Sequence, residues 1–152
     1  MSGERDALRA WLALLSASSA IKKGVDAQLR QRFGVSISRF DVLAALDQAG
    51  AKGCSAGDLT ARLKVTEGNT TQITTPLIAA GLVARSASPA DGRVANFRLT
   101  PEGRRLFDRM AEENRALIAE SFAALSPTDI ATLRHLLAQL VPPIPAAREE
   151  AA

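Results

Sequence analysis

Cysteine, histidine and aromatic side chains are scarce in this chain of 152 residues. It contains one cysteine, one histidine, one tryptophan, five phenylalanines and no tyrosine. The single cysteine, Cys54, excludes an internal disulfide and favours a reducing compartment. The single histidine, His135, has no partner motif that could complete a metal site. No nucleophile or metal cluster stands in a recognisable catalytic setting, so we expect neither an enzyme nor a cofactor.

Long apolar runs are also missing. No run approaches the roughly 18 residues that a helix needs to span a bilayer. The first residues alternate charged and apolar side chains, which is not the pattern of a signal peptide. We therefore expect a cytoplasmic protein without a membrane partner.

The chain has enough apolar side chains for a real core, and only a small excess of charge. Apolar residues make up 47% of it, which excludes a disordered chain, and Ala and Leu dominate them, as is typical of helical proteins. The net charge of +3 is unevenly placed: residues 1–53 carry three more basic than acidic side chains, residues 54–100 two more, and residues 101–152 two fewer. This distribution is a weak indication of a polyanionic partner.

The first predicted element is one long amphipathic helix over residues 6–33. Its apolar residues recur in steps of three and four, and Gly34 follows its end. They are Leu8, Trp11, Leu12, Leu15, Ile21, Val25, Leu29 and Phe33. Such a helix has more apolar surface than a small domain can cover. We expect it to pack against later helices of this chain or against a second copy.

Capping residues mark the starts of four further helices. These residues are Ser38, Ser55, Thr66 and Ser126. The helix after Ser38 is expected to stop at Gly50, and the helix after Thr66 to cover residues 67–80. Thr100-Pro101 begins one more helix, with an apolar stripe of Leu106, Met110, Leu117, Ile118, Phe122 and Leu125. The proline-rich segment after Val141 cannot continue a helix.

The hydrophobic period changes between Gly81 and Thr100. Leu82-Val83 predicts a short strand, residues 88–92 have the composition of a turn, and residues 94–99 predict the return strand. Two short helices followed by such a hairpin predict a winged helix-turn-helix, which places one helix in the major groove of DNA. The predicted fold is therefore mainly α with a small β wing.

Several short motifs make the sequence similar to a known family. Gly81-Leu82-Val83, Asp91-Gly92-Arg93 and Leu99-Thr100-Pro101-Glu102-Gly103 resemble the MarR family of bacterial transcription regulators, and Val65-Thr66-Glu67-Gly68-Asn69 resembles the entry to its recognition helix. The resemblance covers nearly the whole chain. It implies a homodimer, which binds a pseudo-palindromic DNA operator as a repressor and is released by a small, often aromatic-acid ligand. It also implies dimerisation helices over residues 1–36 and 101–141 and a winged helix-turn-helix over 37–100. The proline-rich segment itself predicts a mobile tail over 142–152.

The predicted reading surface is the outward face of the helix that follows Thr66. We expect Thr70, Ile73 and Leu77 to pack inward. The outward side chains are rich in hydrogen-bonding groups and poor in long charges, as base reading requires. With the cap, they are Thr66, Glu67, Gly68, Asn69, Thr71, Gln72 and Thr75.

The hairpin contributes a second set of candidate DNA contacts. We expect Arg93 at its tip to reach a minor groove, where narrow A·T tracts concentrate negative potential. Asp91 is expected to orient Arg93 and cap the turn. Arg85 and Arg98 flank the hairpin and are candidates for phosphate contacts.

Two residues depart from the family pattern. Pro76 lies inside the reading helix, where a proline deletes one hydrogen bond and costs roughly 3 kcal/mol in a regular interior. We therefore expect a kink near Gln72. Position 72 is often basic in the family, so the glutamine shifts the expected affinity towards the wing.

The resemblance also implies an effector pocket between the winged helix-turn-helix and the dimerisation helices. We expect it to include Trp11, Ala17, Lys22, Arg39 and Phe40, where an arginine would suit a carboxylate. Two alternatives stay open. One is a redox-responsive repressor that uses Cys54, although the family's sensing cysteines lie in the first helix. The other is a winged-helix module that binds protein instead of DNA.

Overall fold

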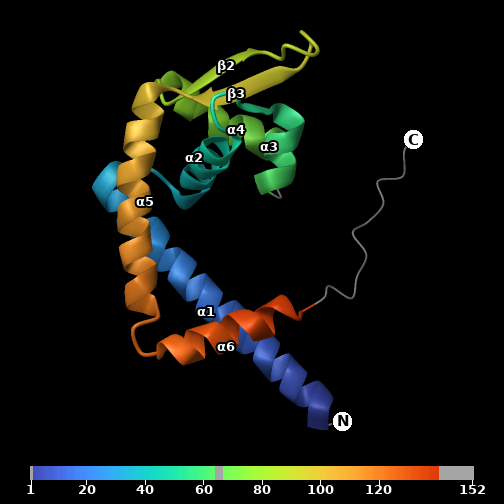
Figure 1. The fold of residues 1–152 in the computed structure, drawn as a ribbon, viewed down its shortest axis with the longest axis vertical. Coiled ribbons are helices and arrows are strands. Elements are labelled where there is room, and N and C mark those ends of the chain that lie inside the picture. The colour runs from blue at the N-terminus through green and yellow to red at the C-terminus, as the bar shows by residue number, and fades with distance from the viewer. Residues whose placement is uncertain (1, 64–66, 141–152) are drawn as a thin grey trace, which may run out of the picture. The chain divides into compact units, whose positions relative to one another are not determined.

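The computed structural model describes residues 2–63 and 67–140, and within them six helices and three strands (Figure 1). The helices are α1 (Ser2–Phe33), α2 (Ile37–Ala49), α3 (Ala56–Leu63), α4 (Glu67–Ala79), α5 (Pro101–Ser121) and α6 (Pro127–Ala138). The strands are β1 (Cys54–Ser55), β2 (Val83–Ala87) and β3 (Ala95–Leu99). The chain forms two compact units, one ending at Ile118 and the other beginning at Ala119. The predicted fold class, mainly helical with a winged helix-turn-helix, is confirmed.

Helix α1 is amphipathic, but only its C-terminal part is covered by its own unit. Val25 and Leu29 are buried, whereas Leu8, Trp11, Leu12 and Leu15 are exposed, Trp11 by 55%. The helix begins at Ser2, four residues before the predicted start, and ends at Phe33 as predicted. Half of the apolar stripe therefore lacks a partner within the unit.

Helix α2 begins at a different serine from the one predicted. Ser36, not Ser38, is the N-cap, and its hydroxyl oxygen accepts the amide hydrogen of Arg39. The Asp26 carboxylate of α1 accepts the Ile37 amide hydrogen at 2.9 Å and the Arg30 guanidinium at 2.8 Å. The first amide groups of α2 are thus held by its own cap and by α1, which fixes the junction between the two helices.

The three strands form one antiparallel sheet in the order β1-β3-β2. The hairpin is confirmed with small shifts, because β2 starts at Val83 instead of Leu82 and β3 at Ala95 instead of Val94. The two-residue β1, which pairs Cys54 with Phe97, was not predicted. Gly53 precedes it with a φ of 74°, and a Cβ there would overlap the Phe97 carbonyl oxygen. The close approach of two backbones therefore requires glycine at this position.

The core of the first unit lies where α2, α3, α4 and the sheet meet the C-terminal part of α1 and the N-terminal half of α5. Its most deeply buried side chains are Leu29, Val42, Leu43, Leu46, Leu59, Val83 and Met110. Phe40 of α2 stacks on Phe107 of α5, with ring centroids 5.6 Å apart. This core supports α4 from behind and leaves its other face exposed.

Helix α5 is joined tightly to the start of the hairpin. The Thr100 hydroxyl donates to the Gly81 carbonyl at 2.6 Å, and the Thr100 amide donates to the Leu82 carbonyl at 3.1 Å. Gly103 lies so close to Leu82 that a Cβ would overlap the Leu82 carbonyl. Further along, Glu113 pairs with Arg32 of α1 at 2.7 Å.

The last helices differ from the prediction mainly in length. Helix α5 ends at Ser121, so Phe122 and Leu125 of the predicted stripe lie beyond it. Helix α6 has the predicted cap, since Ser126 and Asp129 form a reciprocal capping box with Pro127 in the first turn. The predicted tail after residue 141 lies outside the described residues. Among the described helices, none is long and apolar enough to cross a membrane.

Candidate nucleic-acid interface

Helix α4 has one buried face and one exposed face, as its period predicts. Thr70 is 3% exposed and Leu77 2%, and Ile73 is partly buried against the core. Five of the predicted reading positions are exposed: Gly68, Asn69, Thr71, Gln72 and Thr75. Thr66, and the side chain of Glu67, lie outside the described part of the chain. The exposed face offers amide and hydroxyl groups and no long cation at the five positions described.

Threonine side chains join α4 to α3. Of these, only Thr70 was predicted to pack inward. The hydroxyl oxygens of Thr60 in α3 and Thr70 in α4 lie 2.9 Å apart. The Thr60 hydroxyl also donates to the Ala56 carbonyl at 2.8 Å, and the buried Thr74 donates to the Thr70 carbonyl at 2.9 Å. Buried hydroxyls need such partners. The contact between Thr60 and Thr70 helps to fix how α4 packs on α3, and therefore which face of α4 is exposed.

The helix runs on through Pro76. Residues on both sides of it are helical, and the Ala80 amide donates to the Pro76 carbonyl at 3.0 Å. The proline therefore does not end α4, and the predicted kink stays a prediction.

The hairpin turn is organised by Asp91. Its carboxylate accepts the backbone amide hydrogen of Arg93 at 3.0 Å, and its carbonyl accepts that of Val94 at 3.0 Å. The Ser88 amide donates to the Val94 carbonyl at 2.7 Å. These hydrogen bonds agree with the expectation that Asp91 caps the turn. The turn holds the Arg93 backbone in place while the side chain stays exposed.

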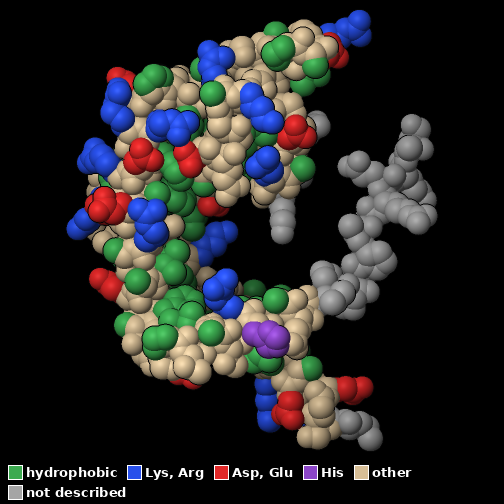
Figure 2. Space-filling model, viewed as in Figure 1, with side chains coloured by type: hydrophobic (Ala, Val, Ile, Leu, Met, Phe, Trp, Pro, Cys, Tyr) green, Lys and Arg blue, Asp and Glu red, His purple; other side chains and the backbone are tan. Residues whose placement is uncertain are grey.

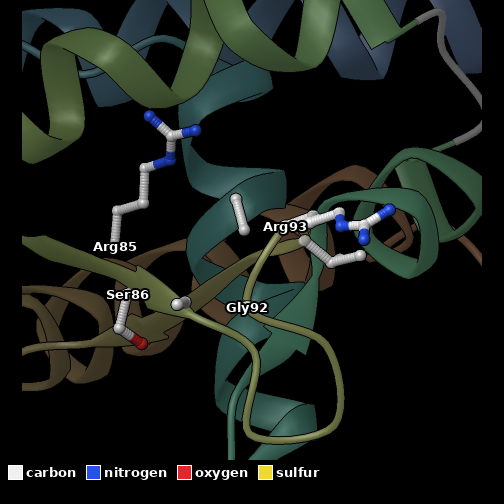
Figure 3. A pocket seen from close by; sticks show the side chains of 7 residues that line it. Arg85, Ser86, Gly92 and Arg93 are labelled. Atoms are coloured by element: carbon white, nitrogen blue, oxygen red, sulfur yellow. The ribbon is translucent and has the colours of Figure 1, made fainter.

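The three predicted arginines of the hairpin do not share one side. Arg85 and Arg93 line the same open hollow, from β2 and from the turn, and Figure 3 shows them extending from different sides of it. In the strand register Arg85 stands opposite the buried Phe97, whereas Arg98 pairs with Ala84. Neighbouring residues of a strand point to opposite faces, so Arg98 projects from the other face of the sheet. Basic side chains lie over the hairpin and its tip (Figure 2).

The residues predicted for an effector pocket are not gathered in one place within the chain. Trp11 is exposed on α1, three turns before Lys22, a distance of about 16 Å along a helix. Phe40 is buried and stacked on Phe107, and Arg39 is half-buried beside it. Partial burial raises the pKa of Asp41 on α2, and the positive charge of Lys22 opposes part of this rise.

Cys54 has the environment of a structural residue. It is 4% exposed in β1, and burial raises the pKa of its thiol, against a smaller lowering by Arg62. A reactive cysteine needs the thiolate and access, and this site offers neither at neutral pH. His135 lies 2.7 Å from the Gln139 side chain, and the described residues contain no cluster of three or more metal-ligating side chains.

Comparisons with known proteins match this arrangement. The sequence profile of the MarR family matches residues 33–94, which cover α2 to the tip of the hairpin. The chain is 30% identical over 110 residues to the HTH-type transcriptional repressor IacR of Pseudomonas putida. This match covers 72% of the chain and 65% of IacR, less than two thirds of that repressor's length.

Solved structures share the fold over most of the chain. A Bordetella bronchiseptica protein, BpsR, whose DNA binding is regulated by 6-hydroxynicotinic acid, is 25% identical, with a TM-score of 0.74 over 86% of this chain and 96% of its own. A MarR family regulator of Streptomyces coelicolor, solved in complex with DNA, is 21% identical, with a TM-score of 0.79 over 88% of this chain and 84% of its own. From its sequence and its fold, the chain belongs to the MarR family.

Proposed function

We propose that the protein is a homodimeric transcription repressor that binds a pseudo-palindromic DNA operator. The observation that carries this proposal is the exposed face of α4, where Asn69, Thr71, Gln72 and Thr75 present short hydrogen-bonding groups next to a hairpin with an exposed arginine. Base reading needs such groups held on a rigid element. The repressor function of IacR and the DNA complex of the Streptomyces coelicolor neighbour support it.

In this proposal each type of side chain contacts a different part of the DNA. Asn69 and Gln72 can bond an adenine edge with two hydrogen bonds, and the threonines offer a hydroxyl and a methyl. Arg93 enters the minor groove beside the major groove that α4 occupies. Arg85 and Arg98 contact phosphates on different sides of the wing, since they project from opposite faces of the sheet. Thr66, Glu67 and Gly68 are proposed as further DNA contacts, and Asp91 shapes the turn.

The dimer is proposed from the uncovered half of α1. Leu8, Trp11, Leu12 and Leu15 are exposed there, and a contiguous apolar stripe of this kind is typical of an interface. On α6, taken by itself, Leu136 and Leu137 are also exposed. We propose that residues 1–36 and 101–141 form the dimerisation region around a reading head of residues 37–100. Two reading heads would then meet half-sites one DNA turn apart.

A small aromatic acid is the proposed effector. The 6-hydroxynicotinic acid response of BpsR supports this ligand class. Trp11, Lys22, Arg39 and Phe40 are the proposed contacts, with Arg39 as the carboxylate partner. Because Trp11 and Lys22 lie about 16 Å apart along α1, these four residues could act together only across a dimer. An Arg39→Ala variant that still releases DNA on addition of 6-hydroxynicotinic acid would remove this pocket from consideration.

Paired substitutions test the reading surface. Arg93→Ala should weaken binding to most sequences, and Asn69→Ala should cost about 1–3 kcal/mol at particular bases only. Arg148→Ala is the matched control, since it also removes one arginine, from a segment to which the proposal assigns neither DNA contacts nor dimer contacts. Fluorescence anisotropy on a selected operator measures all three. If Arg93→Ala and Asn69→Ala bind like the parent, the reading surface is elsewhere.

A further inference from the structure

Thr60 of α3 contacts the reading helix through its buried face. Helices α3 and α4 pack against each other (Figure 1), and the hydroxyl oxygens of Thr60 and Thr70 lie 2.9 Å apart. Thr70 is 3% exposed, whereas its neighbours in the chain, Asn69 and Thr71, are exposed and belong to the proposed reading surface. Thr60 therefore touches α4 from behind, at the residue that stands between two reading positions.

The Thr60 hydroxyl is also held within its own helix. It donates to the carbonyl of Ala56, one turn earlier in α3, at 2.8 Å. Apolar side chains of both helices, such as Leu59 and Leu77, are buried in one core, but hydrophobic contact has no preferred direction. A hydrogen bond has a preferred length and direction. The contact between Thr60 and Thr70 can therefore fix a position of α4 on α3 that apolar packing alone leaves free to shift.

The size of the effect follows from the distance between the two oxygens. A carbon atom approaches an oxygen only to about 3.3–3.6 Å. A methyl group in place of the Thr60 hydroxyl would therefore displace the Thr70 side chain by roughly half an ångström. Recognition groups must be held within about 0.5 Å of their productive positions, so a displacement of this size is enough to disturb base reading.

We propose that Thr60 is a positioning residue for base reading, which sets the position of α4 in the major groove without touching DNA. This inference rests on the proposed function, that α4 reads bases there. A change at Thr60 should weaken the base contacts of Asn69 and Thr71, which flank Thr70. It should leave the contacts to phosphates intact, and these contacts supply nearly all of the non-specific affinity.

The test measures the ratio of operator affinity to non-specific affinity, by fluorescence anisotropy on a selected operator and on a duplex of unrelated sequence. Thr60→Val removes the hydroxyl and nearly keeps the size of the side chain. It should lower operator affinity about tenfold, as expected for one weakened base contact, and leave non-specific affinity unchanged. Thr60→Ser keeps the hydroxyl and should keep the ratio of the parent. Thr60→Ala also removes the hydroxyl, should lower the ratio as well, and replaces Thr60→Val if circular dichroism shows that valine prevents folding.

Thr74→Val is the matched control for a loss of stability. Thr74 is 2% exposed, and its hydroxyl donates to the Thr70 carbonyl at 2.9 Å and to the Thr71 carbonyl at 3.3 Å, both within α4. This variant should lower the Tm but keep the ratio, because the contact with α3 remains. A purely structural role of Thr60 would give the same result for Thr60→Val.

A double-mutant cycle gives a second readout, which a loss of stability alone does not produce. Asn69→Ala should weaken operator binding less in Thr60→Val than in the parent, because Asn69 is already displaced there. Arg93→Ala should have the same effect in both, since the hairpin does not depend on Thr60.

Four results would overturn the inference: a ratio that survives Thr60→Val, a ratio that Thr60→Ser lowers equally, an equal fall in Thr74→Val, or additive effects of Thr60→Val and Asn69→Ala. Failure of the proposed function looks different, because selection with the parent would then enrich no operator at all.

Discussion

Substituting Gly103 by alanine tests how the hairpin is joined to α5. Gly103 lies in the first turn of α5, directly against the backbone of Leu82 at the start of the hairpin. An added Cβ would overlap the Leu82 carbonyl oxygen and lie 2.9 Å from its carbonyl carbon. Both partners are backbone atoms, so no side-chain rotation can make room. The helix or the hairpin must move instead.

The expected cost follows from these contacts. Overpacking costs typically 1–3 kcal/mol, and a clash with a rigid backbone belongs at the upper end. Moving Leu82 also strains its hydrogen bond from the Thr100 amide, 3.1 Å long. Alanine returns up to about 1 kcal/mol through its better helix propensity. The net loss is therefore about 2 kcal/mol, which corresponds to a Tm lower by roughly 4–8 °C for a chain of this length.

Thermal unfolding followed by circular dichroism measures this change. All variants are compared at one protein concentration, because the Tm of the proposed dimer would depend on it. Gly57→Ala is the matched control. Gly57 lies in the first turn of α3, and a Cβ there meets nothing within 4 Å, so its variant should be as stable as the parent or more stable by up to about 1 kcal/mol. If Gly103→Ala unfolds at the temperature of the parent or higher, the tight junction between α5 and the hairpin is wrong.

Three further predictions concern single side chains. The hydrogen bond from the Ile37 amide, and then that from Arg30, lower the pKa of Asp26. The parent should therefore be more stable than Asp26→Asn at pH 7 and lose this advantage as the pH falls below about 4. Urea unfolding across pH measures the difference in stability, and a difference that stays constant would contradict the contact. Ser36→Ala should destabilise the protein by about 1 kcal/mol and Ser38→Ala by less than about 0.5, and the reverse order would restore Ser38 as the cap. In the folded protein, Cys54 should react with iodoacetamide at pH 7 far more slowly than in urea, because burial raises the pKa of its thiol. Rapid labelling of Cys54 in the folded protein would support the redox alternative.

Local chemistry made much of the fold predictable. The helix ends before Gly34, Gly50 and Gly81, and the caps at Ser55 and Ser126, depend on residues within a few positions of each other. The outward face of α4 follows from helical period alone. These features need no knowledge of distant parts of the chain.

Other features depend on contacts between distant residues, which local patterns do not contain. Two serines near Gly34 have similar local chemistry, and the bond from Asp26 to the Ile37 amide helps to favour Ser36 as the cap. Strand β1 exists only because it pairs with Phe97. The opposite projection of Arg85 and Arg98 needs the register of the hairpin, which the turn composition alone did not fix.

The most direct test of DNA reading by a dimer is selection from randomised duplex DNA, followed by titration of the selected site at several salt concentrations. The proposed function predicts an enriched inverted repeat with half-site centres about 10 base pairs apart, and an affinity that falls steeply as salt rises. No enrichment, or binding to a partner that salt does not affect, would contradict it and favour a winged helix that binds protein.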